Sequence, residues 1–587
     1  MSSLEEKPQP KTMPVNAITQ YVENVATLNS NVDQLPRGYF KSPLFIGTYL
    51  ACGLSLLCGA GTFSLIAPLL SSINRDIGPS PNYVWISLAY QLLLGVGCTL
   101  VGRVTDLFGR RWVFVGGSFL AVIGNIICAT APAIGALVAG MTIVGAATAT
   151  QLSFVFVLGE LVPMKHRYLA NAGLYFMSIP FAAFGPAISL SLVNDAGRGW
   201  RWVYYILIIV NGVTTALWFF FYHPPTFHML NRNARAKRML KDFDYVGFIL
   251  FSGGLATMLL GLSWGGGVYP WKSAHVIATL VVGGVSSVAF VLYEVYAHLE
   301  QPYVPMHLFK NAGWVAATVV VCVGAMVYYA FSIIWPLMVV NLYAPKASIV
   351  GLVSCVVSGM VVAAALAGLG TIGLFKQTRY YLAINSLIGT ALLAAVSVAT
   401  QHNESSVLGL LIPGIFFIGI AEAVSLTMTG IVVKNQDEIG TAVGLSASLR
   451  SLAGTLAASI YTTILTNRLT ETIPAEVAPA AIGAGFPESS LPDLIGILSG
   501  LINPDQVPDV TPDILAVATD AYRTAFSKSI KTVFLVTIAF GVLSVVASMF
   551  CPNRDDALND LVMKTLHRPK EEKGLENALR VEEEANN

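Results

Sequence analysis

The chain has 587 residues, of which 55% are apolar and 11% are charged, and its formal net charge is +1. Soluble globular domains carry roughly a quarter charged residues. Together with a mean hydropathy of +0.67, this composition excludes a mainly disordered chain and a set of soluble domains. The balanced charge gives no basic surface for a nucleic-acid partner. We therefore expect an all-α, polytopic membrane protein whose solvent is the lipid bilayer.

Residue patterns of the common cofactor sites are missing from the sequence. The seven cysteines lie in or beside apolar runs without a Cys-x-x-Cys pair, which favours small buried hydrophobic residues over disulfides or metal ligands. The eight histidines are scattered, whereas a membrane-embedded enzyme needs clustered His, Asp or Glu. No Walker-type Gly-x-x-x-x-Gly-Lys-Ser/Thr motif occurs. We expect no catalytic residues, no metal, no cofactor and no ATP-driven step.

Apolar runs long enough to cross a bilayer follow one another along the chain. A spanning helix needs about 20 apolar residues, and about fourteen runs meet that length. The first run begins near Pro43 and is too long for a cleaved leader peptide. The runs centre near Leu57, Leu93, Leu120, Val144, Ala182, Ile208, Leu255, Val285, Val327, Val361, Leu392, Ile418, Ala453 and Leu543.

Lysine and arginine collect in alternate short loops, which the positive-inside rule places in the cytoplasm. An even number of spans then puts both termini in the cytoplasm. Within the expected outer loop, residues 491–502 are apolar enough to lie on the membrane surface. The predicted parts are a cytoplasmic N-terminal segment (1–42), a first six-span half (43–222), a basic cytoplasmic linker (223–244), two inserted spans (245–298), a second six-span half (299–552) that includes an outer loop (467–527), and a cytoplasmic tail (553–587).

The strongest local motif joins the second and third spans. Its glycines allow a tight turn, its acid suits the positive end of a neighbouring helix, and its arginines can pair with acids or lipid phosphate. The ordered pattern favours a conformational latch, closed in one conformation and open in another, over a simple solvated loop. The candidate latch residues are Gly102, Arg103, Asp106, Gly109, Arg110 and Arg111.

Two ionisable residues lie well inside predicted spans. Glu422 is in the twelfth span and Arg450 in the thirteenth, equally far along the chain from Gln436 in the turn between them. Antiparallel helices then place both at similar depth, where they can pair. A charge in a span costs about 2.5–3.5 kcal/mol on insertion scales, so it needs a reason to be there. A static ion pair that fastens two helices and a proton-coupling site remain equally open.

Uncharged polar groups in the spans are candidates for the lining of a cavity. Bonds between helices are the more frequent role of such groups. Gly185 and Pro186 can kink the fifth span, where rocking halves need close packing. The candidate cavity residues are Gln91, Gln151, Tyr175, Asn211 and Asn385.

The loop motif resembles the signature of the major facilitator superfamily. Further segments resemble its fourteen-span drug:proton antiporters, including the Gly-Pro signature at Gly185-Pro186. The stretch Glu160–Arg167 resembles the fungal trichothecene efflux pump family, in a form that fungal siderophore transporters share. The other matching segments are Val84–Tyr90, Gly199–Trp202, Asp244–Gly247 and Leu262–Gly266.

One position departs from the antiporter pattern. Superfamily antiporters usually carry an arginine in the fourth span ahead of a glycine, and Met141 stands at that position here. The proton-relay role of that arginine therefore does not carry over to this chain.

The resemblance implies a major facilitator fold of about fourteen helices arranged 6+2+6, with alternating access between two six-span halves. It also implies proton-coupled efflux of a hydrophobic fungal metabolite, toxin or drug across the plasma membrane by a monomer. A siderophore-iron importer on the same scaffold is the alternative, since no motif gives the direction of transport.

Overall fold

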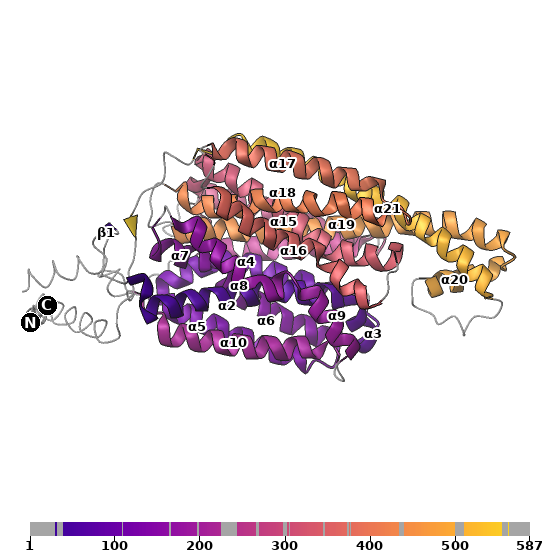
Figure 1. Cartoon of the computed structure of the whole chain (residues 1–587), viewed down its shortest axis with the longest axis horizontal. Coiled ribbons are helices and arrows are strands. Elements are labelled where there is room, and N and C mark those ends of the chain that lie inside the picture. The colour runs from indigo at the N-terminus through magenta and orange to yellow at the C-terminus, as the bar shows by residue number, and fades with distance from the viewer. Residues whose placement is uncertain are drawn as a thin grey trace, which may run out of the picture.

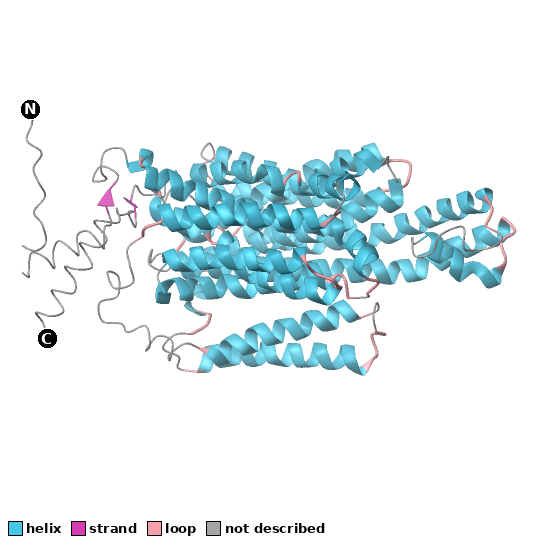
Figure 2. Cartoon of the chain, turned by 90° about the horizontal axis from the view of Figure 1, so that it is seen from below, coloured by secondary structure: helices cyan, strands magenta, loops and turns pink. Residues whose placement is uncertain are grey.

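The protein is described here from a computed structural model. The described residues are 30–31, 39–553 and 561–562, with gaps at 81, 109, 164–165, 196–198, 225–243, 266–268, 298–301, 305, 344–346, 373–374, 376, 434–438 and 499–509. Within them the chain is mainly helical, and two short strands, β1 (Ser30–Asn31) and β2 (Leu561–Val562), pair antiparallel at one end of the bundle (Figure 2). Most of the predicted linker 223–244 lies outside the described residues.

The described residues come close to the predicted number of spans. Thirteen of their helices are long and apolar enough to cross a membrane, and the second predicted span contains a shorter apolar stretch, Trp85–Val101, of α4 (Trp85–Phe108). All fourteen predicted centres lie within helices. The all-α, polytopic fold expected from the composition is therefore correct.

The first six spans form what we call the first bundle. The fifth span is broken between Ala182 and Gly185, where α8 ends and α9 begins. Besides α4 and a short 3-10 turn η3 (Tyr39–Lys41), its elements are α2 (Pro43–Ile66), η4 (Ala67–Leu69), α3 (Leu70–Ile77), α5 (Arg110–Ala129), α6 (Ile134–Leu152), α7 (Phe154–Leu161), α8 (Arg167–Ala182), α9 (Gly185–Asp195) and α10 (Arg201–Phe221).

Two further spans, the inserted pair α13 (Tyr245–Trp264) and α14 (Ala274–Tyr296), pack on each other and separate the first bundle from the second in sequence. The second bundle consists of η6 (Met306–Lys310), α15 (Ala312–Met338), the π-helical turn η7 (Val339–Tyr343), α16 (Ala347–Thr371), α17 (Thr378–Ala395), η9 (Val396–Val398), α18 (Glu404–Ile431), α19 (Ile439–Gly483), η11 (Glu488–Ser490), α20 (Leu491–Leu498) and α21 (Pro512–Ser548).

The two bundles lie side by side. In Figure 1 the first bundle, coloured indigo to purple, lies below the second, which runs from pink to yellow. They meet where α4 packs along α19 and where α8 and α9 pack on α16. The helix α13 also contacts α19, so the inserted pair packs against the second bundle.

Short polar residues begin several of the spans. Each accepts a hydrogen bond from a backbone N–H of the first helical turn, which satisfies a donor that has no partner within the helix. These N-caps explain why the helices begin at the boundary of each apolar run. They are Ser42 for α2, Asp244 for α13, Ser273 for α14, Asn311 for α15 and Thr511 for α21.

The segment 467–527, expected as a loop, is mostly helical. The helix α19 has 45 residues, a length of about 68 Å at 1.5 Å per residue, against a hydrocarbon core of about 30 Å. It continues past the bundle and, with α20 and the start of α21, forms a helical hairpin that projects from one end (Figure 1). The segment is rich in Pro, Asp and Glu, which favours a loop, but α19 contains Pro474 and Pro479 within its helix.

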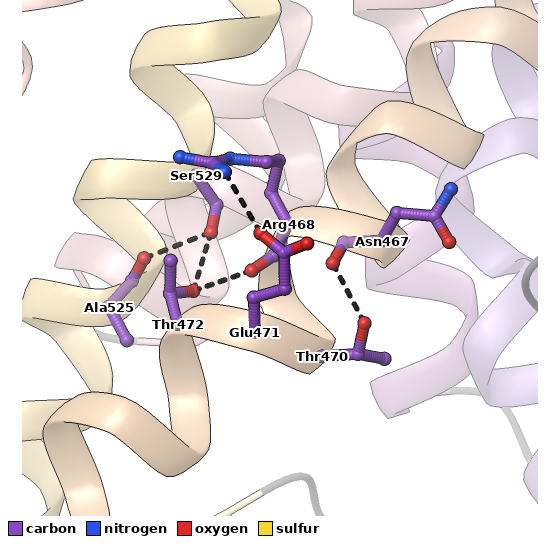
Figure 3. A network of polar contacts seen from close by, with 7 residues as sticks. All are labelled: Asn467, Arg468, Thr470, Glu471, Thr472, Ala525 and Ser529. Atoms are coloured by element: carbon purple, nitrogen blue, oxygen red, sulfur yellow. Dashed lines mark hydrogen bonds and ion pairs between the residues drawn. The ribbon is translucent and has the colours of Figure 1, made fainter.

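An apolar core and a polar network hold this hairpin together. The core contains Val477, Leu494 and Ala518, so the apolar face expected to lie on the membrane surface is buried against α19 and α21 instead. Figure 3 shows the network at the base, where the hydroxyl oxygens of Thr472 on α19 and Ser529 on α21 lie 2.8 Å apart. The same network includes an exposed ion pair between Arg468 and Glu471 at 2.9 Å.

Candidate functional site

Glu422 and Arg450 form an ion pair inside the second bundle. Arg450 Nε donates to Glu422 Oε1 at 2.8 Å, and Nη2 lies 2.7 Å from the same oxygen. The Glu422 side chain is 6% exposed and the Arg450 side chain 16% exposed. The structure thus brings together the two charged residues that the sequence placed at equal depth, and the pair links α18 to α19.

Tyr329 of α15 joins this pair. Arg450 Nη1 donates to the Tyr329 hydroxyl at 3.3 Å, and the guanidinium carbon lies 5.5 Å from the centre of the tyrosine ring. Two glycines make room for the arrangement. A Cβ at Gly454 would lie 2.1 Å from Tyr329 Cδ2, and a Cβ at Gly324 would lie 2.4 Å from Glu422 Cβ. Three helices therefore meet at one charged centre.

The ion pair borders a cavity between the two bundles, which we call the central cavity. It holds about 80 Å³ of space. Sites for small molecules usually hold about 300–1,000 Å³, so the bundles are drawn together around it in this conformation. Its walls include Leu56, Phe63, Cys98, Tyr175 and Ser178 from the first bundle and Tyr328, Tyr329, Val361, Glu422 and Arg450 from the second.

Aromatic rings from both bundles pack together at the central cavity. The ring of Phe63 on α2 lies 4.9 Å from that of Tyr329 and 6.0 Å from that of Tyr328, both on α15. It also stacks on Tyr90 of α4 at 6.5 Å. Such rings give a large apolar contact area while the tyrosine hydroxyls supply polar contacts. The wall therefore suits a bulky, mainly apolar ligand that carries a few oxygen atoms.

The bundles touch on both sides of the central cavity. Along α8, Asn171 Nδ2 donates to Thr427 Oγ1 of α18 at 3.2 Å, before the cavity residue Tyr175. At the other edge of the cavity, Ser358 Oγ of α16, which lines the cavity, donates to the Ala183 carbonyl at 3.1 Å. These two hydrogen bonds join the bundles at different points along the cavity.

The Gly-Pro motif lies at this interface. Gly185 starts α9, and a Cβ there would lie 2.6 Å from Ser64 Oγ on α2. Two residues later, Ala187 lies against α16, because a Cβ at Gly351 would be 3.1 Å from its Cα. The break between α8 and α9 thus directs α9 into the space between the two bundles.

The latch motif spans the end of α4 and the start of α5. Gly102, Arg103 and Asp106 belong to α4, their side chains lie outside the described residues, and so does Gly109. Arg110 is buried, and its Nη2 lies 3.9 Å from where a Cβ at Gly440 of α19 would be.

The second described arginine of the motif, Arg111, donates from Nη2 to the Phe219 carbonyl at 2.7 Å. The motif therefore faces the second bundle through Arg110 and the first bundle through Arg111.

Of the five polar candidates for the cavity, Tyr175 lines it. Gln151 Nε2 instead donates to Asn211 Oδ1 at 2.5 Å and joins α6 to α10. Asn385 donates to the Tyr381 carbonyl of its own helix at 2.7 Å. Gln91 is fully buried, and its amide has no hydrogen-bond partner among the described residues.

Met141, at the position where antiporters carry arginine, is buried in α6. The hydroxyl of Tyr204 on α10 donates to its sulfur at 3.8 Å. The position thus carries an uncharged contact between two helices of the first bundle, whereas the Glu422–Arg450 pair lies in the second bundle.

A family comparison decides what kind of protein combines these features. The model of the fungal trichothecene efflux pump (TRI12) family matches residues 19–582. The chain belongs to this family. It is similar to the trichothecene efflux pump TRI12 of Trichoderma arundinaceum, with 28% identity over 93% of this chain and 92% of the relative. The major facilitator efflux assignment from the sequence is thereby confirmed.

Other relatives and solved structures agree with this assignment. The chain is 26% identical to the MFS-type transporter prx5 of Penicillium rubens, over 86% of this chain and 91% of the relative. The solved structure of the proton:xylose symporter XylE covers 89% of this chain and 99% of its own, with 14% identity and a TM-score of 0.53. At that identity the likeness shows the fold alone, which is the major facilitator fold.

Sequence reasoning named Tyr175 but none of the other aromatic residues of the site. Phe63, Tyr328 and Tyr329 look like any other aromatic residues in apolar runs, since 10% of the chain is aromatic. One available signal was the pair Tyr328-Tyr329, two adjacent hydroxyl-bearing residues in a mainly apolar span. Another was the small residue Gly454, four residues after Arg450 on the same helix.

Proposed function

We propose that this family member exports a hydrophobic fungal metabolite, toxin or drug by proton-coupled alternating access. The central cavity binds the substrate, and the first and second bundles rock around it. The observation that carries the proposal is the Glu422–Arg450 pair in the wall of a cavity between the bundles. Relatives described as trichothecene efflux pumps support a toxin-like substrate.

Substrate binding must widen the central cavity. A space of about 80 Å³ is too small for such a ligand. The Asn171–Thr427 bond on one side of the cavity and the Ser358–Ala183 bond on the other break in turn as each side opens. This narrow state corresponds to an intermediate between inward-open and outward-open states.

Glu422 is the proposed proton carrier. Among the described residues that line the central cavity, Glu422 is the one carboxylate and Arg450 the one strong base. A proton on Glu422 removes its attraction for Arg450, which keeps its contact with Tyr329. The guanidinium is then free to change its position. Protonation of Glu422 and substrate binding therefore both act on Arg450, which couples the proton to the substrate.

Purified protein in liposomes with an imposed pH gradient tests the proposal. A trichothecene should accumulate in vesicles with an acidic lumen when the cytoplasmic face is outside. Glu422→Gln should abolish the gradient-driven part while retaining substrate binding. Glu471→Gln, at the exposed pair of the hairpin, is the matched control and should transport normally. Full gradient-driven transport by Glu422→Gln would rule out Glu422 as the proton carrier.

The proposed setting is the plasma membrane, with a monomer whose termini face the cytoplasm. The start of α2 and the end of α21 lie at the same end of the bundle in Figure 1, as an even number of spans requires. A protease-sensitive tag at either terminus should be cleaved in permeabilised cells and protected in intact ones. Cleavage in intact cells would reverse the orientation.

A further inference from the structure

A second cavity, which we call the lateral pocket, lies outside the central one. The inserted helix α13 and the second-bundle helices α15 and α19 form its walls. It holds about 300 Å³ and is lined almost entirely by apolar side chains. Residues from each wall include Phe251 and Leu255 of α13, Trp314 and Cys322 of α15, and Leu452 and Ala453 of α19.

The lateral pocket and the central cavity share no lining residue. On α19 they use different faces, because Arg450 and Ser451 face the central cavity whereas Leu452 and Ala453 face the lateral pocket. On α15 they use different stretches of the helix. Tyr328 and Tyr329 line the central cavity, whereas the stretch from Trp314 to Cys322 lines the lateral pocket.

Depth in the membrane decides what can fill the lateral pocket. It extends from Trp314, near the start of α15, to Cys322, a distance of about 12 Å along the helix at 1.5 Å per residue. One leaflet accounts for about 15 Å of a hydrocarbon core of about 30 Å. The pocket thus runs from the boundary of one leaflet nearly to the midplane, the path of a single acyl chain.

Polar groups lie at the end of the pocket near the start of α15. A bare acyl chain makes no hydrogen bonds, whereas the ester and phosphate groups of a phospholipid do. Trp314 is fully buried in the wall, and its Nε1–H has no hydrogen-bond partner among the described residues. Phe309 also lines the pocket, and the next residue in η6, Lys310, is exposed. An indole donor suits an ester oxygen, and an interfacial lysine suits a lipid phosphate.

We propose that the lateral pocket is a binding site for one phospholipid. An acyl chain fills the space between α13, α15 and α19. Trp314 Nε1 has no exposed surface in this conformation, so binding turns the indole until its Nε1–H reaches the ester region, and the phosphate lies near Lys310. Because surrounding lipid is as apolar as the pocket, the preference for a bound lipid comes from close packing and from these two polar contacts. The site is independent of the proposed transport function.

Photo-crosslinking in vesicles tests this site. The full chain is reconstituted into phosphatidylcholine vesicles that contain a trace of phosphatidylglycerol with a diazirine on one acyl chain, irradiated, digested and mapped by mass spectrometry. Adducts should concentrate on the α15 segment from Trp314 to Cys322 and on the facing residues of α13. Adducts spread equally over exposed lipid-facing residues, such as Val288 of α14, would overturn the proposal.

Variants separate a specific site from general lipid contact. Ala453→Trp fills the pocket and should reduce these adducts several-fold, whereas Val288→Trp on the exposed face of α14 should not. Ala453→Leu, a milder filling, should give a smaller reduction and covers the case in which the tryptophan variant fails to fold. Unchanged adducts in both folded Ala453 variants would overturn the proposal.

The polar contacts and the rival occupant are tested in the same assay. Lys310→Gln and Trp314→Phe keep the apolar wall and should each weaken labelling by the lipid tracer. Equal labelling of these variants and the unmodified chain would contradict the proposed headgroup contacts. A trichothecene added in excess should leave the adducts unchanged. If it displaces them from α15, the pocket is a substrate path from the bilayer and the lipid proposal fails.

Discussion

The central cavity and the lateral pocket share α15 and α19 but have opposite chemistry. The inward face of α19 carries Arg450, which is bonded to Glu422 and Tyr329. The outward face carries Leu449, Leu452 and Ala453. One helix thus combines an ionic centre with an apolar pocket wall, and a single step along the chain changes from one to the other.

The largest effect should come from breaking the charged centre. Arg450→Leu leaves Glu422 buried without its partner, and loss of one partner of a buried pair costs about 3–5 kcal/mol of folding free energy. Thermal unfolding followed by size-exclusion chromatography measures the loss. Leu449→Met, next along the chain and facing the lateral pocket, is the control and should change little.

A double variant sharpens this prediction. Glu422→Gln with Arg450→Met removes both charges and should recover most of the lost stability, because the pair then leaves no buried charge. Gradient-driven transport should stay absent. Recovery of both stability and transport would show that the ion pair only holds α18 and α19 together and takes no part in proton coupling.

Tight packing at the charged centre should make Gly324 sensitive. Gly324→Ala places a Cβ 2.4 Å from Glu422 Cβ, and overpacking of this kind costs about 1–3 kcal/mol. Gly284→Ala on α14 is the matched control, because nothing lies within 4 Å of its Cβ position. Equal melting temperatures for the two variants would show that α15 and α18 can move apart freely.

The outer wall of the lateral pocket depends on a helix cap. Asp244 Oδ1 accepts from the Gly247 N–H at 2.7 Å at the start of α13. Asp244→Ala should destabilise by about 1 kcal/mol, whereas Asp244→Asn retains an acceptor and should be close to neutral. Hydrogen exchange in the first turn of α13 reports the difference. Equal exchange in both variants would show that the cap contributes nothing.

The smallest effect is expected in the projecting hairpin. Arg468→Ala removes the exposed pair with Glu471, and exposed pairs contribute about 0–1 kcal/mol. A loss of stability as large as that of Arg450→Leu would show that buried and exposed ion pairs on α19 contribute equally to the free energy of unfolding. The same unfolding assay gives both values.

Hydropathy and charge were enough to predict the positions of the spans and the Glu422–Arg450 pair. Both follow from local rules, because a run length sets a span and equal distances from a turn set equal depth. The partners of Gln151 and Asn211 were not predictable in this way. They lie 60 residues apart, and they meet because α6 and α10 both pack on α5. Tyr329 was missed for the same reason.

The hairpin is a helical structure that mean hydropathy along the sequence does not predict. Its core side chains, such as Val477 and Ala518, are separated by charged and proline residues that lower the average. A helical packing motif of this kind buries only one face of each helix, so its apolar residues are too sparse to read as a span. The pattern was visible only once α19 and α21 were placed beside each other.

The continuity of α19 connects the ionic centre to the tip of the projecting hairpin through one helix. The helix that holds Arg450 extends unbroken into the projecting hairpin, so a small tilt at the ionic centre becomes a larger displacement at the tip. A pair of spectroscopic probes, one at the tip and one on the first bundle, would follow the transport cycle from outside the bilayer. The projection also breaks the near-symmetry of the two halves, which makes single particles easier to align in electron cryo-microscopy.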